Sequence, residues 1–157
     1  MSDKTTFQIS IPLDKDGFLR RECPTCEREF KWFHTPEGSD ATIGPADGGY
    51  FCPYCGVQAQ PNMWQTQAQV KLVRETAMSE VVGPILRDFA AGISSRNKPG
   101  AMVQVKASYS EPPAPEPLAE DDDMVQVDFP CHSTEPVKVL EDWDSPVHCL
   151  ICGMRTA

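Results

Sequence analysis

The chain contains two similar cysteine motifs, Cys23-Pro-Thr-Cys26 and Cys52-Pro-Tyr-Cys55-Gly56, which are separated by 25 residues. A Cys-x-x-Cys turn aims backbone N–H groups at the thiolates and places both sulfur atoms about 2.3 Å from a shared metal ion. The proline stiffens each turn, and Gly56 supplies the positive φ on which such a turn commonly ends. Two turns joined by a hairpin complete a tetrahedron of four thiolates, the donor set of a structural zinc ion. We therefore expect Cys23, Cys26, Cys52 and Cys55 to bind one zinc ion.

The segments next to these turns have the composition of short strands. Residues 18–21 lead into the first turn, residues 30–33 leave it, and residues 50–51 lead into the second. Between them, residues 34–49 are rich in glycine, proline, aspartate and threonine, and we expect a loop. Further upstream, the apolar residues of the segment 7–11 alternate with polar ones, which is typical of a half-buried strand.

The order of strands, turns and long loop over residues 18–60 resembles the zinc-ribbon superfamily. The Cys-Pro-x-Cys-Gly ending of the second turn is also shared with rubredoxins. The first resemblance implies a structural zinc ion, and the second implies iron and electron transfer, because a four-thiolate site suits both metals. Glu27 follows the first cysteine pair where the rubredoxin pattern has glycine, and this departure favours zinc.

A second, less regular set of candidate ligands follows later in the chain. The stretch Cys149-Leu-Ile-Cys152-Gly153 repeats the second turn, but Cys131 has Thr134 where a paired cysteine would stand. The fourth ligand of this site is therefore a histidine, either His132 or His148, and we favour His132. We expect Cys131, His132, Cys149 and Cys152 to bind a second zinc ion. The alternative is a degenerate ribbon without metal.

The central part of the chain has the pattern of an amphipathic helix. Asn62 has the character of an N-cap, with Gln65 in capping-box register. The pattern predicts a helix over residues 64–91, and Gly83-Pro84 is expected to kink or split it because proline removes a backbone hydrogen bond. We expect the apolar stripe to pack against the ribbons, with an exposed docking face as the alternative. The stripe consists of Val70, Val73, Ala77, Val81, Ile85 and Phe89.

Composition divides the chain into four parts. These are an N-terminal zinc ribbon (1–60), a helical segment (61–100), a short strand with a proline-rich and acidic linker (101–123), and a C-terminal ribbon-like module (124–157). The strand is expected at residues 102–106. The fold class predicted is small α+β and metal-stapled, with two zinc ribbons, each a short antiparallel β-hairpin, flanking a kinked amphipathic helix. The overall chain resembles small bacterial double-zinc-ribbon proteins.

Charge and cysteine usage indicate the class of partner and the compartment. The 157 residues carry a formal charge of −9, which is concentrated after residue 110. Such a chain is repelled by phosphate backbones, so a protein partner is favoured over nucleic acid. The sequence has no secretory signal and no membrane-spanning stretch, and its seven cysteines suit a reducing compartment. We therefore expect a cytoplasmic protein without membrane contact.

We find no catalytic pattern in the sequence. Each complete Cys-x-x-Cys set closes its site and leaves no open position for water, and no cysteine or histidine has the glutamate partner of a zinc deaminase. The function predicted is a non-catalytic zinc-binding adaptor or regulatory protein, with no small-molecule substrate. The alternatives are nucleic-acid binding through the basic segment 71–98 and a rubredoxin-like electron carrier.

Overall fold

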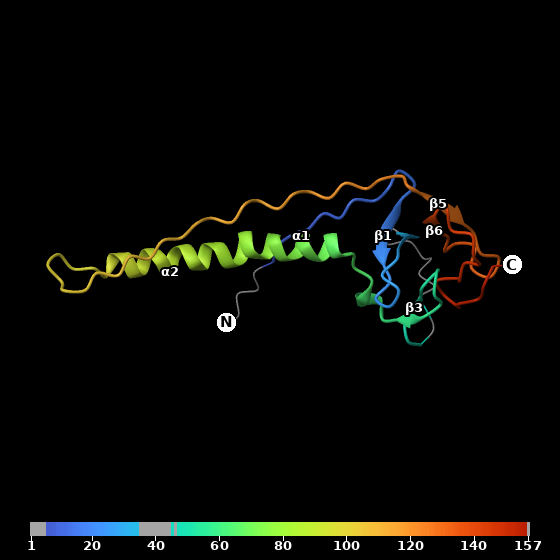
Figure 1. Cartoon of the computed structure of the whole chain (residues 1–157), viewed down its shortest axis with the longest axis horizontal. Helices are drawn as coiled ribbons and strands as arrows, with labels where there is room; N and C mark the ends of the chain where they lie inside the picture. Colours follow the sequence, from blue (N-terminus) through green and yellow to red (C-terminus); the bar gives the residue numbers. More distant parts are fainter. Residues whose placement is uncertain (1–5, 35–44, 46, 157) are drawn as a thin grey trace. The chain divides into compact units, whose positions relative to one another are not determined.

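The computed structural model describes residues 6–34, 45 and 47–156, and the chain divides into two compact units. The sheet unit comprises Ile11–Gln69 and Leu118–Ala157. The helical unit comprises Met1–Ser10 and Val70–Pro117. Figure 1 shows all strands in the first unit and the long helices mainly in the second.

Among its described residues, the sheet unit contains two antiparallel sheets. The larger sheet has the strand order β1-β2-β6-β5, and the smaller pairs β3 with β4. The strands are β1 (Phe18–Glu22), β2 (Glu29–Phe33), β3 (Tyr50–Phe51), β4 (Gln58–Ala59), β5 (Met124–Val127) and β6 (Val137–Leu140).

The larger sheet joins strands from the two predicted ribbon modules. Strand β2 pairs with β6 through Lys31 opposite Lys138 and Trp32 opposite Val137. The prediction placed these strands in separate hairpins at the two ends of a helix, and the structure differs from it. The physical reason is that an isolated two-stranded hairpin is at best marginally stable in water. A sheet of four strands with one buried face is stable by itself. The near absence of exposed surface on Val137 and Val139 shows the gain from this pairing.

The core of the sheet unit is aromatic and lies against the cysteines. Phe30 and Trp64 have no exposed surface, and their ring centroids lie 5.7 Å apart in an edge-to-face arrangement. Tyr54 packs against Phe30 with the same geometry at 6.5 Å. Cys23 and Cys52 belong to the same buried cluster. Aromatic pairs of this kind stabilise beyond the area that they bury, so this core holds the cysteine turns in place.

Two segments predicted as strands pair with no other strand among the described residues. In the segment 7–11, the apolar residues are half-buried and alternate with exposed polar ones, but no ladder forms. In the segment 102–106, the side chains of Met102 and Val103 are 103% and 76% exposed. In the second segment, the backbone N–H and C=O of Val105 bond to the Asn97 side chain instead of to a neighbouring strand, at 3.1 and 2.8 Å. Strand composition without a strand partner therefore does not form a strand here.

The helix begins later than predicted. A 3-10 turn, η1 (Pro61–Met63), contains Asn62, and helix α1 runs over Gln67–Ala77. The capping box is formed by Thr66 and Gln69 instead of Asn62 and Gln65. The Gln69 backbone N–H donates to the Thr66 hydroxyl, and the Thr66 N–H donates to the Gln69 side chain, both at 3.1 Å. The boundary between the two units falls directly after Gln69.

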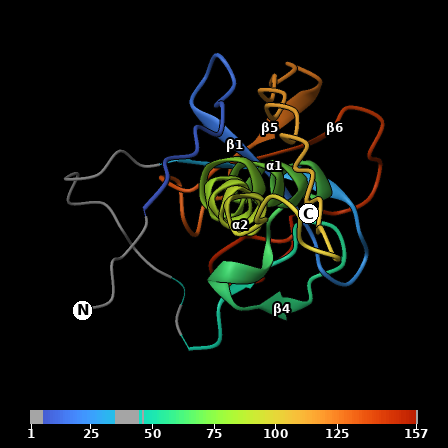
Figure 2. The ribbon, with the colours of Figure 1, turned by 90° about the vertical axis from the view of Figure 1, so that its left-hand side faces the viewer.

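The helix passes Pro84 through a π-helical segment. The segment η2 (Met78–Val82) separates α1 from α2 (Gly83–Ser95), and the Gly83 N–H donates to the Met78 carbonyl. This wider turn absorbs the hydrogen bond that proline removes. Figures 1 and 2 show α2 continuing α1 nearly along one axis, so the predicted break is a change of helix type with little kink.

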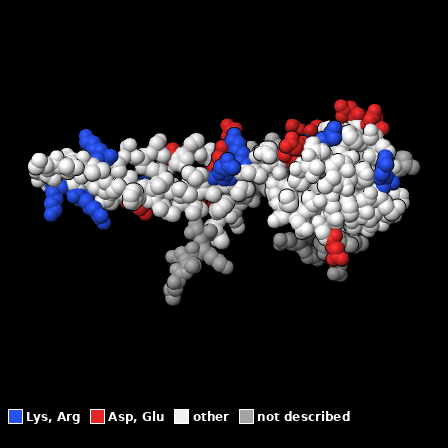
Figure 3. Space-filling model, turned by 60° about the horizontal axis from the view of Figure 1, so that its bottom comes forward, with Lys and Arg blue, Asp and Glu red and all other residues white. Residues whose placement is uncertain are grey.

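Four residues of the apolar stripe, Val70, Val73, Ile85 and Phe89, are exposed, whereas Ala77 and Val81 are half-buried. Ile85 and Phe89 are 62% and 66% exposed, which differs from the prediction that the stripe is buried against the ribbons. The proline-rich segment contacts the helix elsewhere, where Arg87 forms an ion pair with Glu111 at 2.7 Å and lies over the Tyr109 ring. Figure 3 shows the basic side chains of this unit on more than one side, with acidic ones interspersed.

Candidate metal centres

The first candidate centre brings together the four cysteines of the two regular turns. The Sγ atoms of Cys23 and Cys55 lie 3.7 Å apart, as do those of Cys26 and Cys52. Four sulfur atoms at about 2.3 Å from one zinc ion lie about 3.8 Å from each other in a regular tetrahedron. All four ligand atoms are within 4.8 Å of one another. The geometry therefore fits a tetrahedral metal ion and is far too open for disulfide bonds, which need about 2.05 Å.

The same backbone turn occurs three times. In each case the N–H of the first cysteine donates to the carbonyl five residues later: Cys23 to Arg28 at 3.0 Å, Cys52 to Val57 at 2.9 Å and Cys149 to Met154 at 2.8 Å. In the first turn, the backbone N–H groups of Thr25 and Cys26 also donate to the Cys23 sulfur, both at 3.4 Å. These donors stabilise the thiolate form, which is the form that binds metal.

The second candidate centre contains a histidine. The Sγ atoms of Cys131 and Cys152 lie 3.6 Å apart, and the Cys149 Sγ lies 3.5 Å from Nδ1 of His132. Zinc–sulfur and zinc–nitrogen bonds of about 2.3 and 2.0–2.1 Å place such atoms about 3.6 Å apart. His148 turns away, and its Nδ1 lies 3.2 Å from the Pro53 carbonyl oxygen. The structure therefore brings His132 together with the three cysteines, whereas His148 lies outside this cluster.

Burial disfavours the thiolate form of one deeply placed cysteine in each centre. Burial raises the pKa of the Cys149 thiol to about 12 and raises that of Cys52 further. Several thiolates at this spacing are therefore unfavourable unless a divalent cation compensates their charge. All seven cysteines are free, and the only nitrogen ligand among the described clusters comes from His132. This donor set, with sulfur dominant and a single imidazole, is one that zinc prefers.

Tyr54 connects the second turn of the first centre to the larger sheet. Its hydroxyl donates to the Glu29 carbonyl at 2.8 Å and accepts from the Leu140 N–H at 3.0 Å. Burial raises the pKa of Tyr54 to about 12, so the hydroxyl keeps its proton at neutral pH. One side chain from the turn thus satisfies backbone groups of both β2 and β6. No motif in the sequence indicates this role.

The two centres are joined by reciprocal backbone hydrogen bonds. The Phe51 N–H donates to the Leu150 carbonyl, and the His148 N–H donates to the Pro53 carbonyl, both at 2.9 Å. In each bond the donor directly precedes the first cysteine of one turn, and the acceptor directly follows the first cysteine of the other. The second and third turns are therefore related by a local pseudo-twofold pairing that the separate-module prediction did not contain.

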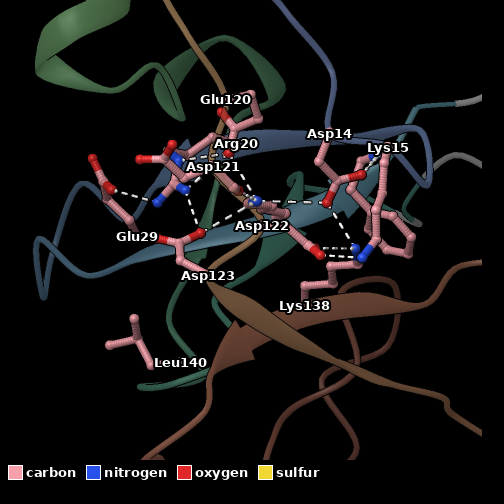
Figure 4. Close-up of polar contacts among 12 residues, drawn as sticks. Asp14, Lys15, Arg20, Glu29, Glu120, Asp121, Asp122, Asp123, Lys138 and Leu140 are labelled. Carbon is pink, nitrogen blue, oxygen red and sulfur yellow. Dashed lines mark hydrogen bonds and ion pairs between the residues drawn. The ribbon is translucent and has the colours of Figure 1, made fainter.

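A third group of candidate ligands holds an ammonium group. Asp14, Asp16 and Asp122 converge, but Lys138 Nζ lies 2.7, 2.6 and 3.6 Å from their carboxylate oxygens. Figure 4 shows this lysine and the neighbouring acidic residues. Burial raises the pKa of Asp14, but the hydrogen bonds from Lys138 and from two backbone N–H groups outweigh it and hold the pKa at about 2. This group is an internal ion-pair cluster.

The acidic run 120–123 takes part in the same cluster. Lys31 has no exposed surface, and its ammonium group lies 2.8 Å from Glu120 and 3.3 Å from Asp123. Arg20 forms ion pairs with Glu120 at 2.8 Å and with Asp123 at 2.5 Å. The acidic end of the predicted linker is therefore held against the sheet by ion pairs with buried cations. Lys31 and Lys138 lie in strand positions that composition alone would place at the surface.

No family model, curated protein or solved structure matches the chain. Among the described helices, none has the length and apolar character needed to cross a membrane. The assignment of function therefore rests on the geometry of the two cysteine clusters.

Proposed function

We propose that this protein binds two structural zinc ions, one in each cluster, and acts as a non-catalytic adaptor through contacts with another protein. The observation that carries the proposal is the spacing of the ligand atoms, 3.5–3.7 Å in both clusters, which is that of tetrahedral zinc coordination. A site with four protein ligands has no open position for water or substrate. Zinc in such a site supplies folding free energy to a small core and no chemistry.

The histidine in the second centre favours zinc over rubredoxin-type iron. Rubredoxin-like electron transfer uses four thiolates, and the second centre offers three thiolates and one imidazole. Zinc accepts both donor sets with the same tetrahedral geometry. One metal can therefore fill both centres, which supports a structural role for each.

Charge favours a protein partner. The sheet unit holds 17 acidic and 7 basic residues, a formal charge of −10. Zinc-bound thiolates add about −2 at a four-cysteine site and about −1 at a three-cysteine site. In the helical unit, Arg87 is paired with Glu111, and Lys71 lies 3.8 Å from Glu75. The basic side chains of the nucleic-acid alternative are thus partly neutralised by their neighbours.

The test is metal stoichiometry by native mass spectrometry on purified protein. The proposal predicts two zinc ions per chain and one after Cys23→Ser or Cys149→Ser. His132→Ala should also lose one ion, whereas its matched control, His148→Ala, should keep both because His148 lies outside the cluster. A single ion in the unmodified protein would contradict the two-centre proposal, and a red sample with iron absorption would favour the electron carrier.

A further inference from the structure

Strand β5 forms an edge of the larger sheet. It pairs with β6 on one side, with Met124 opposite Leu140 and Gln126 opposite Lys138, and the sheet order ends with it. The Leu140 N–H donates to the Tyr54 hydroxyl and so points away from β5. In an antiparallel pair, bonded and non-bonded positions alternate. The backbone groups of Met124 and Gln126 therefore point outward from the sheet.

These outward groups have no backbone partner among the described residues. Two N–H and two C=O groups in this arrangement match the ladder of a further strand. The opposite edge of the sheet is different, because the Glu22 N–H of β1 donates to the Trp64 carbonyl and the Gln69 side chain donates to the Arg20 carbonyl. Of the two edges, β5 is the one that can accept an extended chain.

The charges around β5 indicate which kind of partner segment can bind at this edge. Directly before the strand stand Glu120 and three aspartates, and directly after it stands Asp128. Six carboxylates of the ion-pair cluster face four cations, so the cluster remains negative. The carboxylates are Asp14, Asp16, Glu29, Glu120, Asp122 and Asp123, and the cations are Lys15, Arg20, Lys31 and Lys138. Together with the charge of −10 on the sheet unit, this favours a basic partner.

The same charges disfavour a second copy of this chain at the edge. An antiparallel pair of two β5 strands centred on Val125 would place Asp122 of each chain opposite Asp128 of the other. Like charges directly opposite each other destabilise a strand pair. Acidic residues on both sides of an edge strand thus protect it from self-association while leaving it open to a basic chain.

A hollow lies directly beyond the end of β5. Its volume is about 350 Å³, and its apolar lining includes Phe129, Pro130 and Met154. Met154 is 62% exposed at this place. A hollow next to a sheet edge is where a bound strand places an apolar side chain, and such pockets supply specificity to main-chain pairing.

We infer that the β5 edge binds an extended basic segment of a partner protein through main-chain pairing at Met124 and Gln126, with one apolar side chain in the hollow. The inference rests on the proposed adaptor function and names its surface and the chemistry of its partner.

The test uses synthetic peptides and the zinc-loaded full chain. The probe is a heptapeptide of alternating lysine and valine. Its first control has glutamate in place of lysine, and its second has the same charge but N-methyl groups on alternate residues, which remove the donors on one edge. We expect micromolar binding of the probe by fluorescence anisotropy. Both controls should bind at least about ten-fold more weakly, because one loses the charge and the other the hydrogen bonds.

Two variants at one position test the surface itself. Gln126→Pro removes an outward N–H that the sheet does not use, so the edge strand tolerates it, and probe binding should fall at least about ten-fold. Gln126→Thr keeps the N–H and should bind the probe as the unmodified protein does. Native mass spectrometry on the same samples reports whether both zinc ions remain, which separates loss of binding from loss of the fold.

The outcomes separate the inference from the proposed function. Equal binding of the probe and its N-methyl control, or unchanged binding by Gln126→Pro, would overturn main-chain pairing in favour of unspecific charge attraction. A dimer in sedimentation that Gln126→Pro dissociates would overturn it in favour of a second copy. If a protein with two zinc ions does not bind the probe, the β5 inference is wrong and the zinc centres stand. A protein without two zinc ions would contradict the proposed function.

Discussion

Glu27 adopts the left-handed backbone conformation of Gly56, with φ values of 57° and 69°. Both residues end a cysteine turn, and both donate their N–H to the first cysteine's carbonyl, at 3.0 and 2.9 Å. Gly153 ends the third turn with a φ of 72°. A residue with a Cβ atom is strained in this region by about 1–2 kcal/mol. The first centre therefore carries a strain that the other turns avoid.

Replacing Glu27 with glycine should stabilise the zinc-loaded protein. We expect a gain of about 0.5–1 kcal/mol, because the relief of strain exceeds the extra freedom that glycine has in the unfolded chain. The measurement is the free energy of unfolding in urea. Glu27→Gln is the control for charge and should change little.

The opposite change at the equivalent position should destabilise the protein. A Cβ atom at Gly56 would lie 2.9 Å from Nε2 of His148, in addition to the strained φ. We expect Gly56→Ala to cost about 1–3 kcal/mol. Lower stability of Glu27→Gly would show that the strain argument is wrong.

Zinc binding at the two centres should be coupled. The Phe51–Leu150 and His148–Pro53 hydrogen bonds join the turns, so ordering one turn by metal also positions the other. We expect the second centre to bind zinc about ten-fold more weakly in Cys23→Ser, a coupling of about 1.4 kcal/mol. Thermodynamic linkage requires that Cys149→Ser weakens the zinc affinity of the first centre by a similar factor. The measurement is titration with a zinc chelator, and equal affinities in the variants and the unmodified protein would exclude coupling.

Removing the Tyr54 hydroxyl should destabilise the sheet unit. Tyr54→Phe leaves the Leu140 N–H and the Glu29 carbonyl without their shared partner, and we expect a cost of about 1–3 kcal/mol. The matched control is Tyr50→Phe, because no hydrogen bond of the Tyr50 hydroxyl is present among the described residues. The free energy of unfolding in urea should separate the two variants, and equal values would show that the Tyr54 bridge adds nothing.

The Asp14 carboxylate should stabilise the protein in a defined pH range. Its pKa is about 2 in the folded state and 3.8 ordinarily, so its contribution is complete above about pH 4 and is lost as the pH falls towards 2. We expect Asp14→Asn to cost about 2 kcal/mol, with a constant difference between pH 5 and 7 that narrows in acid. The exposed residue Asp142 offers the control Asp142→Asn. A difference that grows in acid would contradict the assignment.

The cysteine turns were predictable because their chemistry is local. Spacing and the residue that ends each turn are enough to indicate a knuckle, and the three turns share one hydrogen-bonding pattern. The grouping of His132 with Cys131 was also accessible, since a three-cysteine set needs one more ligand close by. The helix boundary was not, because Asn62 and Thr66 both have cap character, and only the packing of Gln69 against β1 selects Thr66.

The joint sheet was beyond local reasoning. Strand β6 pairs with β2 across about a hundred residues, and nothing in either strand marks its partner. The buried cations show the same limit: Lys31 and Lys138 are favourable inside only because the acidic run 120–123 and Asp14 reach them from distant parts of the chain. Long-range charge pairing of this kind leaves no periodic signal in the sequence.

Zinc K-edge X-ray absorption on the loaded protein reports which atoms coordinate the metal in both proposed centres. If each chain holds two zinc ions, their ligands are the seven cysteines and His132. The two coordination shells together should then contain seven sulfur atoms, one nitrogen atom and no oxygen. The sulfur distance should be about 2.3 Å. A shell with oxygen ligands, or one that fits only a single four-sulfur ion, would contradict the two closed zinc centres.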